Sequence, residues 1–561
     1  MKIVNGLPPV LLKDTFVSID SEFFGQEKAK LHRPGGKFAC MTVCFDSYVY
    51  VTTDEKAIPQ MLDKIKDGTW VMHNALYDIR QLRRYATIKP RFIYDTMLVE
   101  QAMYGGYYQN FSLRDLVRRW LGERMEKEVR DEFSTNTTMT KKMLEYAAKD
   151  ARDTLCVAEA QLKEFDGISR IYEEVDSTMI WPLLDMPGMM VDAEAWKVMV
   201  ASFEEKGKAV EEKLGINVSS PRQVMKKAED YKLFLTDTRA ETLKAYKDNM
   251  FIAGVLEARM YKKASSTYGT KWLTNFVEAD SRVYSSYHIT GTETGRMSAS
   301  SPNMQQIPAR TLPEYRQRFI ASPGNILLVA DVVQQEPCIL AYESQDRELI
   351  RAIKSGEDLH LAVARAIFND PKMEKSDPRR GIGKTINLGT AYGLSEFGLA
   401  VRLGITEQEA ARFLQQYFAR FPDVFLWIST RRIRAVQDGY VSTTMGRKIY
   451  INPYSNQWRN NAINAPIQGG AADFTKMWIY KMWRAFKKAK LPFYLVAIVH
   501  DEVVLDVPKT KVKQVKQIME ESFQDTAKKM FPSIPFKMEI EQGRSWACKQ
   551  MSSEIVEVED D

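Results

Sequence analysis

The chain has 561 residues, more than one hydrophobic core usually serves, so several domains are expected. Hydrophobic residues make up 45% and charged residues 27%, a composition typical of globular proteins that excludes a fibrous or low-complexity chain. The formal net charge of +6 is compatible with a polyanionic partner, but on its own it is more typical of an ordinary soluble enzyme. The most apolar run, residues 493–499, is far shorter than the ~20 residues that span a membrane.

The five cysteines are Cys40, Cys44, Cys156, Cys338 and Cys548. Their spacing matches no zinc or redox motif, which favours free thiols in a reducing compartment. The first ten residues, MKIVNGLPPV, lack the long apolar core of a secretory signal. We therefore expect a cytosolic protein.

Residues 1–175 begin with strand-like runs at 15–19, 38–45 and 48–53 and continue with a helix-like stretch at 139–164. This mixture predicts an α/β or α+β domain. Asp20 and Glu22 lie two residues apart in the first run, so their side chains project from one face of a strand. Two such carboxylates repel each other unless a cation lies between them, although alone the pair is typical of solvated surface acids.

Two further motifs have the four-residue spacing of one helix face. Asn74 and Asp78 form the first of them. In the second, Tyr146 precedes Asp150, where a phenol near a carboxylate-bound metal could orient a water molecule. Each fragment alone is typical of an ordinary helix with an exposed acid. The ordered set of three motifs over about 130 residues is much harder to obtain by chance.

From about residue 177 the pattern is mostly helical, and residues 200–271 are dense in lysine and arginine. Such a run usually indicates a solvated helix face. The stretch 262–268, which contains Lys263, combines basic and small hydroxyl side chains and would also suit contacts to phosphates.

A second acidic set lies at the ends of predicted strands. The apolar run 326–330 stops at Asp331, and residues 495–499 and 503–505 predict two strands joined by a polar turn. That turn consists of His500, Asp501 and Glu502. Carboxylates at strand ends and hairpin tips can meet at the edge of a sheet, although the tripeptide alone is typical of an ordinary turn.

The residues that recur every four positions along a predicted helix between these strands are Arg380, Lys384, Leu388 and Tyr392. Two cations, an apolar side chain and an aromatic ring suit a triphosphate at one end and a base at the other. The alternative is an amphipathic helix with a basic surface. Gly381 and Gly383 argue mildly against that alternative, because each glycine costs a helix up to about 1 kcal/mol.

The first acidic set resembles the DEDDy class of 3′–5′ exonucleases that are fused to family A DNA polymerases. The second resembles those polymerases themselves, the bacterial DNA polymerase I group and its phage relatives. Residues 331–336 resemble motif A of the family, 380–393 motif B and 500–502 motif C, and residues 292–308 and 464–469 match two further signatures. The resemblance covers nearly the whole chain.

The resemblance implies a multidomain α/β and α+β fold, with an RNase H-like exonuclease domain followed by a right-hand polymerase. The expected bounds are 1–175 for the exonuclease and 176–561 for the polymerase, with the thumb at about 195–285, the palm at about 286–345 and 440–561, and the fingers at about 346–439.

For the exonuclease, the resemblance implies that two divalent metals are bound by Asp20, Glu22, Asp78 and Asp150. Tyr146 would help to position the attacking water, and the second metal would stabilise the leaving 3′ oxygen. The implied cofactor is magnesium, two ions in each active site, and manganese could replace it.

For the polymerase, the implied metal ligands are Asp331, Asp501 and the Val332 carbonyl, with Glu502 and Lys384 as further catalytic residues. The implied nucleotide contacts are His360, Arg380, Lys384, Leu388, Tyr392, Glu336 and Gln334. Glu336 would crowd the sugar 2′ position and reject ribonucleotides. The implied DNA contacts are Arg296, Gln468, Asn464, His500 and Lys263. Arg296 and Gln468 would read minor-groove acceptors, which every correct base pair presents alike.

The positions that depart from the family pattern are Val333, Pro337, Cys338, Leu388 and Asn460. They put base stacking, dideoxynucleotide tolerance and a template contact in doubt, but they remove no metal ligand. The second hypothesis is a single-subunit RNA polymerase, because those enzymes share the four-residue spacing of motif B. Glu336 and the exonuclease motifs favour a DNA polymerase instead. A catalytically dead DNA-binding subunit is the third, and the intact carboxylates argue against it.

The implied partners are primer–template DNA and dNTPs, bound by a monomer. The acidic end of the chain, residues 554–561, suggests a contact with a helicase or another replisome protein. The first motif begins about twenty residues from the start, which leaves no room for a 5′-nuclease domain. We therefore expect a phage-like enzyme of genome replication, acting in the host cytoplasm.

Overall fold

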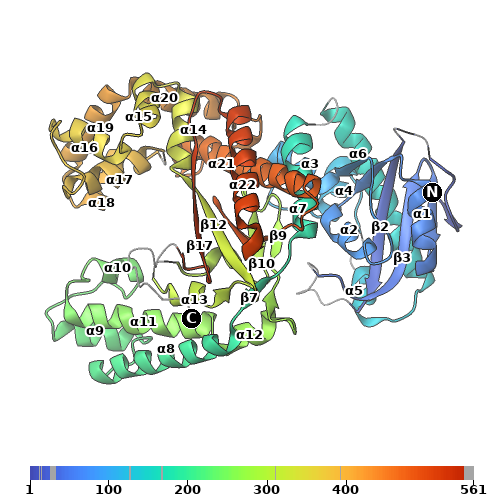
Figure 1. Ribbon diagram of the computed structural model, residues 1–561, viewed down its shortest axis with the longest axis horizontal. Helices are drawn as coiled ribbons and strands as arrows, with labels where there is room; N and C mark the ends of the chain where they lie inside the picture. Colours follow the sequence, from blue (N-terminus) through green and yellow to red (C-terminus); the bar gives the residue numbers. More distant parts are fainter. Residues whose placement is uncertain are drawn as a thin grey trace.

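The computed structural model describes residues 1–11, 13, 15–25, 33–125, 128–165, 169–309, 311–391 and 393–548. In Figure 1 an N-terminal domain lies at the right, and a central sheet separates one helical block at the upper left from another at the lower left. No helix in the described part of the chain is both long enough and apolar enough to cross a membrane.

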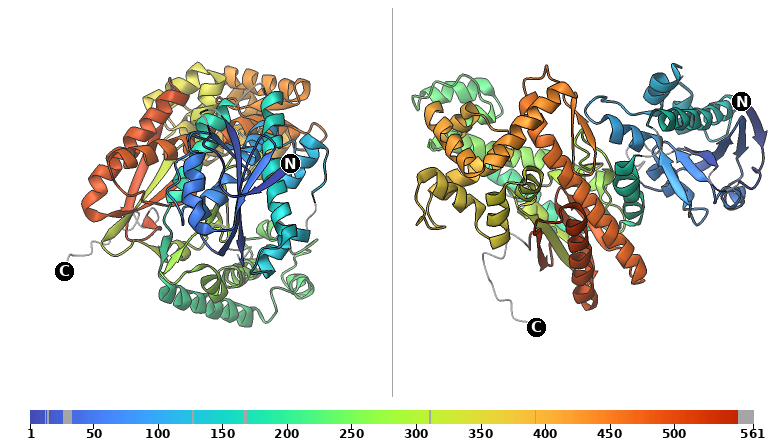
Figure 2. Two further views of the ribbon diagram at one scale, coloured as in Figure 1. Left: turned by 90° about the vertical axis from the view of Figure 1, so that its right-hand side faces the viewer. Right: turned by 90° about the horizontal axis from the view of Figure 1, so that it is seen from above.

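The N-terminal domain is built on a mixed sheet of six strands in the order β1-β4-β3-β2-β5-β6. Its strands are β1 (Lys2–Asn5), β2 (Phe16–Phe24), β3 (Lys37–Phe45), β4 (Tyr48–Thr52), β5 (Thr69–Met72) and β6 (Phe92–Asp95). Its helices are α1 (Ile58–Lys64), α2 (Ala75–Leu82), α3 (Thr96–Tyr104), α4 (Leu113–Leu121), α5 (Glu128–Thr135) and α6 (Lys141–Glu164). The helix α6 packs across β2 and β3, which buries one face of both strands (Figure 2). The α/β expectation for this segment is confirmed.

A connector leads from this domain to the rest of the chain. It consists of a π-helical turn η3 (Tyr172–Asp176), a 3-10 turn η4 (Ser177–Met179) and the helix α7 (Ile180–Asp185). The hydroxyl of Tyr172 donates to the Ile93 carbonyl at 2.8 Å and accepts the Asp95 N–H at 2.7 Å. The connector is therefore bonded directly to the outermost strand, β6.

The lower helical block consists of α8 (Ala193–Leu214), α9 (Pro221–Glu229), α10 (Ala240–Lys244), α11 (Met250–Thr267) and α12 (Thr270–Phe276). The long helices α8 and α11 pack along each other. Trp196 of α8 and Trp272 of α12 stack with ring centroids 4.5 Å apart. Both rings belong to a buried cluster that continues into the central sheet. The lysine-rich stretch thus forms helices with a buried apolar side, as the pattern predicts.

The central sheet is antiparallel, in the order β15-β16-β12-β17. Its strands are β12 (Asn325–Val333), β15 (Leu495–Val499), β16 (Glu502–Pro508) and β17 (Lys537–Gly543). Leu328 and Ala330 face the core that includes the helices α21 (Trp458–Lys488) and α22 (Val512–Met530). Leu327 and Val329 face the core shared with the lower block. Because both faces of β12 are buried, its sequence is continuously apolar instead of alternating.

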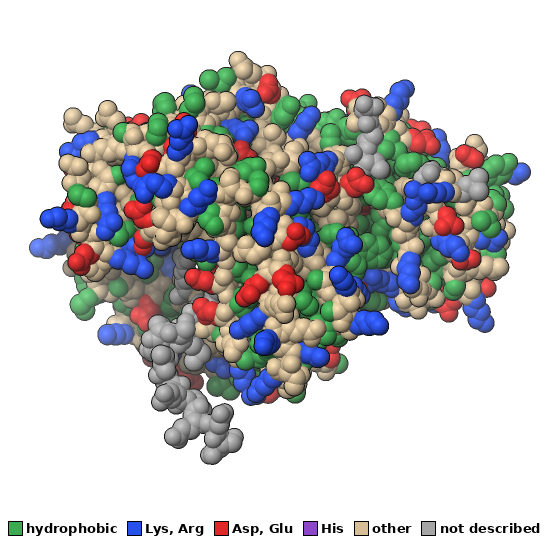
Figure 3. Space-filling view, turned by 45° about the horizontal axis from the view of Figure 1, so that its top comes forward, with side chains coloured by type: hydrophobic (Ala, Val, Ile, Leu, Met, Phe, Trp, Pro, Cys, Tyr) green, Lys and Arg blue, Asp and Glu red, His purple; other side chains and the backbone are tan. Residues whose placement is uncertain are grey.

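The upper helical block consists of α14 (Gln335–Ser344), α15 (Arg347–Ser355), α16 (Leu359–Phe368), α17 (Arg379–Ala391), α18 (Glu396–Leu403), α19 (Glu407–Arg420) and α20 (Pro422–Gln437). Further short strands and one short helix are β7 (Met189–Val191), β8 (Arg282–Val283), β9 (Ser286–His288), β10 (Ser298–Ser300), α13 (Glu314–Gln317), β11 (Phe319–Ile320), β13 (Tyr440–Ser442) and β14 (Lys448–Tyr450). On the face shown in Figure 3, Lys and Arg side chains are spread among acidic ones, so the charge is of mixed sign.

Candidate active sites

The first acidic set meets beside the middle of the N-terminal sheet. The strand β5 pairs with β2 only from Phe16 to Ser18, so the next part of β2 is open on that side. The helix α2, which follows β5, fills this space. There Asp78 Oδ1 accepts the Ser21 backbone N–H at 3.0 Å and the Ser21 hydroxyl at 2.6 Å. The chain order strand–helix thus places Asp78 against the strand of Asp20 and Glu22.

The pKa shifts of Asp78 and Cys40 indicate that the acids of this set lie near one another. Burial, and then the neighbouring Asp20, raises the pKa of Asp78 well above its ordinary value, while the bonds from Ser21 oppose the shift. Cys40 pairs with Glu22 across β2 and β3. Burial raises the pKa of the Cys40 thiol, and Glu22 and Asp20 raise it further. Both carboxylates therefore lie near the same thiol, as expected for side chains on one face of the strand.

The third motif lies on α6, the helix that crosses β2 and β3. Asp150 is buried there, and Tyr146, one turn earlier, packs its ring against Phe133 with centroids 6.3 Å apart. All three motifs therefore lie on elements that meet at β2.

A buried carboxylate that the motif analysis missed supports this site. Asp95 accepts backbone N–H groups of Asn74, Ala75, Met97 and Leu98 at 2.8–3.3 Å. It therefore caps the N-terminal ends of both α2 and α3 and fixes the helix that carries Asp78. Its position at the end of a strand, directly before a helix, is the signal that could have found it.

The second acidic set meets at the edge of the central sheet. In β12, Asp331 lies opposite Glu502 of β16 and Glu539 of β17. Asp501 lies in the turn between β15 and β16, as predicted. Burial, and then the neighbouring Asp331, raises the pKa of Asp501 to about 6. The two predicted metal ligands thus lie close enough to repel each other.

Glu502 is held from the side of the lower block. Its Oε1 accepts Arg316 Nη1 at 3.0 Å and Trp546 Nε1 at 2.8 Å. The Arg316 guanidinium also lies 4.1 Å from the centroid of the Trp546 ring. The sequence pattern gave no sign of these two partners, which fix the start of β16 directly after Asp501.

A cavity of about 440 Å³ opens beside Asp501. The predicted site residues that line it are Arg296, Val332, Gln334, Glu336, Leu388, His500 and Asp501. They come from four segments that are far apart in the chain. Within the cavity wall, Arg296 Nη2 donates to Glu336 Oε1 at 3.0 Å, so the predicted minor-groove reader and the predicted sugar gate form an ion pair.

The predicted phosphate contacts gather on α16 and α17. Asp358 Oδ2 accepts Arg380 Nε at 2.9 Å and Nη2 at 2.7 Å, which ties the guanidinium to the start of α16. Burial lowers the pKa of His360, with Asp358 opposing the shift, so His360 is a neutral hydrogen-bonding group near pH 7. Lys384 is exposed one turn further along. Arg380 borders a second cavity, of about 780 Å³, which shares Gln334 with the first.

The remaining predicted contacts are less closely grouped. Asn464 and Gln468 lie one turn apart on α21, both half-buried. Lys263 is exposed on α11, away from the residues that line the 440 Å³ cavity. Tyr392 lies outside the described residues, so its nucleotide contact stays a prediction.

Another cavity, of about 490 Å³, lies between the N-terminal domain and residues 287–298. Side chains that line it include Asn74, Gln101, Tyr108, Phe111, Tyr287 and His288. It reaches from the start of α2, the helix of Asp78, to the loop that leads to Arg296. Within the described chain no lysine or arginine lines it, so its walls suit bases better than phosphates.

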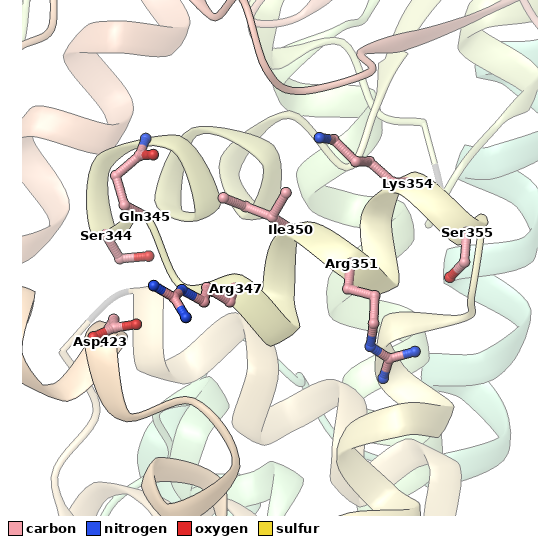
Figure 4. Close-up of a pocket in the computed structure, with 8 residues that line it drawn as sticks. All are labelled: Ser344, Gln345, Arg347, Ile350, Arg351, Lys354, Ser355 and Asp423. Carbon is pink, nitrogen blue, oxygen red and sulfur yellow. The ribbon is translucent and has the colours of Figure 1, made fainter.

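A larger cavity, of about 900 Å³, opens on the outside of the upper block (Figure 4). Arg347, Arg351 and Lys354 of α15 border it. None of the predicted active-site residues that the structure describes lines it, so size alone does not identify a site here.

Among the described residues, no group of three or more His, Cys, Asp or Glu side chains lies close enough together to hold a metal ion. The two pairs of neighbouring carboxylates, Asp20–Asp78 and Asp331–Asp501, nevertheless fit magnesium. They offer only oxygen ligands, and Mg²⁺ commonly binds through one or two carboxylates while keeping several waters or substrate oxygens. A divalent cation between the members of each pair would also relieve their repulsion.

Comparisons with known proteins identify a family for each of the two parts of the chain. Residues 191–548 match the model of the family described as "DNA polymerase family A", and residues 10–165 match a "3′-5′ exonuclease" model. The chain is 27% identical over 529 residues to DNA polymerase I of Caldicellulosiruptor bescii, which covers 89% of this chain and 60% of that protein. It is 30% identical over 493 residues to DNA polymerase I of Pseudomonas aeruginosa, which covers 81% and 53%. The chain thus spans between half and three-fifths of the length of these relatives.

Among solved structures, the chain resembles one described as the POL domain of Pol1 from M. smegmatis in complex with DNA primer-template and dNTP. The TM-score is 0.82 at 25% identity, and the match covers 97% of this chain and 100% of that one.

Proposed function

Because the chain belongs to DNA polymerase family A, we propose that it extends a DNA primer on a template with dNTPs and proofreads with its N-terminal exonuclease domain. The observation that carries the proposal is the pair of separate carboxylate centres, one in each domain. Asp20 and Asp78 repel each other in the first, and Asp331 and Asp501 in the second. Two-metal phosphoryl transfer needs such oxygen-rich centres.

In the polymerase centre, Asp331, Asp501 and the Val332 carbonyl would hold magnesium. In the exonuclease centre, Asp20, Glu22, Asp78 and Asp150 would hold it. Bound there, magnesium would supply Lewis-acid stabilisation of the reacting phosphate and of the attacking and leaving oxygens. Arg380, which is held by Asp358, and the neutral His360 would bind the triphosphate.

The 490 Å³ cavity between the domains suits an unpaired primer end on its way to the exonuclease centre. Its tyrosine and phenylalanine rings could stack on bases of any sequence, which proofreading requires. The relative of known structure is described with primer-template DNA and a dNTP, which supports the same two ligands for this chain.

Several narrower parts of the proposal rest on sequence alone. Contact with a helicase through residues 554–561 falls outside the described residues. The monomeric state, a cytoplasmic location and a role in phage genome replication also stay predictions. A single-subunit RNA polymerase is the competing activity, and the choice of sugar distinguishes the two.

The test is an extension assay on a 5′-labelled primer–template with magnesium. The wild-type chain should extend the primer when dNTPs are present, shorten it from the 3′ end when they are absent, and do neither in EDTA. Asp501→Ala should lower extension by more than about 100-fold and spare shortening, because even outer partners of a metal cost 10–100-fold. Asp20→Ala combined with Glu22→Ala should do the reverse.

Exposed aspartates provide matched controls. Asp525 and Asp63 each have a side chain that is 71% exposed in a surface ion pair, so Asp525→Ala and Asp63→Ala should change neither activity. Synthesis that survives Asp501→Ala would refute the metal assignment. Extension with ribonucleotides equal to that with dNTPs would favour the RNA polymerase.

A further inference from the structure

Four charged side chains are buried together where the N-terminal domain meets the rest of the chain. They are Asp176, Arg447, Asp473 and Lys476, and each is at most 1% exposed. Asp176 ends the connector turn η3, Arg447 directly precedes β14, and the other two lie on α21. Segments up to 300 positions apart therefore meet at one buried point.

Arg447 is the centre of this group. Its guanidinium bonds both oxygens of Asp176 at 2.8 and 2.9 Å and Asp473 Oδ1 at 2.7 and 2.9 Å. Lys476 Nζ adds a bond to Asp176 Oδ1 at 2.6 Å. Two acids and two bases leave no net charge. Removal of one member would leave a buried charge without its partner, which strongly destabilises a folded protein.

The acid from the connector is ionised. Burial alone would raise the pKa of Asp176, but Arg447 and Lys476 hold it below its ordinary value. The guanidinium of Arg447 thus donates hydrogen bonds to Asp176 on one side and to Asp473 on the other. These bonds fix the orientation of its plane.

The loop that carries Arg296 lies directly on this guanidinium. Gly295 has a φ of +80°, and a Cβ added there would lie only 2.5 Å from Arg447 Nε. The next residue, Arg296, reaches into the active-site cavity and bonds Glu336. The other end of the loop touches the exonuclease domain, where the Thr290 hydroxyl donates to Gln101. The loop is therefore shaped by the junction of the two domains.

We propose that Arg447, held by Asp176 and Asp473, is a positioning residue for Arg296, so that the domain junction sets how accurately the polymerase centre recognises a correctly paired primer end. The proposal rests on the proposed function. Arg447 touches neither DNA nor nucleotide in this role; it acts only by supporting the backbone from which Arg296 extends.

The test compares extension from matched and mismatched primer ends, with Asp20→Ala and Glu22→Ala present throughout to remove shortening. Asp176→Asn keeps the shape of the side chain but leaves Arg447 and Lys476 with one carboxylate. It should reduce the preference for a matched end by about tenfold. Arg296→Ala should reduce it similarly, and the two changes together should cost no more than Arg296→Ala alone.

Asp185→Asn is the matched control. Asp185 lies at the same junction and accepts hydrogen bonds from Arg83, Trp483 and Lys487, each at 2.8 Å. Within the described chain, none of these partners belongs to the loop 292–296. Loss of the Asp185 carboxylate should lower the melting temperature and leave the preference for matched ends unchanged. A loss of preference equal to that of Asp176→Asn would overturn the proposal, because any weakening of the junction would then reduce the preference for matched ends.

Additive effects of Asp176→Asn and Arg296→Ala would also overturn it. If Asp176→Asn does not fold, Gly295→Ala disturbs the same contact from the side of the loop without removing a charge. It should show the same loss of preference and the same lack of additivity with Arg296→Ala; an unchanged preference would contradict the proposal. Absence of extension by the chain with intact Asp176 would instead refute the proposed function, which makes the two failures distinguishable.

Discussion

At the scale of single residues, the ion pair between Arg296 and Glu336 gives one side chain two tasks. Glu336 faces the cavity beside Asp501, where it could crowd a sugar 2′ hydroxyl, and it also fixes Arg296 at 3.0 Å. The sequence motifs predict each residue separately. They could not predict the pair, because its members lie 40 positions apart on a loop and a helix that only the tertiary fold brings together.

Substitution of Glu336 separates the two tasks. Glu336→Ala should raise the ratio of ribonucleotide to deoxyribonucleotide incorporation by at least about tenfold, since it removes a steric barrier as well as a charge. Glu336→Gln keeps the bulk and loses only the ion pair, so its sugar selectivity should stay near that of the wild type. The measurement is kcat/KM for one rNTP and its matching dNTP. Equal ratios in all three proteins would rule out the gate.

At the scale of elements, the two glycines near the start of α17 have different reasons to be there. A Cβ added at Gly383 would lie 2.2 Å from the His360 carbonyl oxygen, so this glycine lets α16 and α17 touch. A Cβ added at Gly381 would meet nothing within 4 Å. The sequence could show only that both glycines weaken a helix. The reason for Gly383 is the neighbouring helix, which no local pattern reveals.

The prediction at this scale compares two alanine variants of one helix. Gly383→Ala must push α16 away from α17, which moves His360 relative to Arg380 and should raise KM for dNTPs several-fold while lowering the melting temperature. Gly381→Ala removes a helix-weakening glycine from an open position and should stabilise the protein by about 0.5–1 kcal/mol. Steady-state kinetics and calorimetry on both variants provide the check. Identical effects of the two substitutions would contradict the packing argument.

Strands were predictable where burial leaves a clear pattern. The apolar run that forms β12 and the turn with Asp501 lie where expected, because a strand buried on both faces is continuously apolar. The partner strand β17 was not predicted, since Lys537–Gly543 is largely polar and half-exposed. Glu539, opposite Asp331, was missed for the same reason.

At the scale of the whole molecule, the sequence predicted an exonuclease domain followed by a polymerase domain, and the family comparisons confirm this order. It did not predict how the domains meet. The contacts that join them, such as the bond from Arg447 to Asp176 across 271 positions, involve residue types that elsewhere form ordinary surface ion pairs. Only their burial distinguishes them, and burial is a property of the assembled chain.

The bond from Tyr172 to β6 has a consequence for where the exonuclease domain can be cut. β6 is an outer strand of its sheet, and the connector's hydroxyl occupies backbone groups on its open side. The family match ends at residue 165, before Tyr172. A fragment ending there would expose a bare strand edge that can pair with a second copy. By light scattering, the fragment 1–165 should self-associate, whereas the fragment 1–186 should stay monomeric; the smallest stable unit of this domain would then include the connector that its family match leaves out.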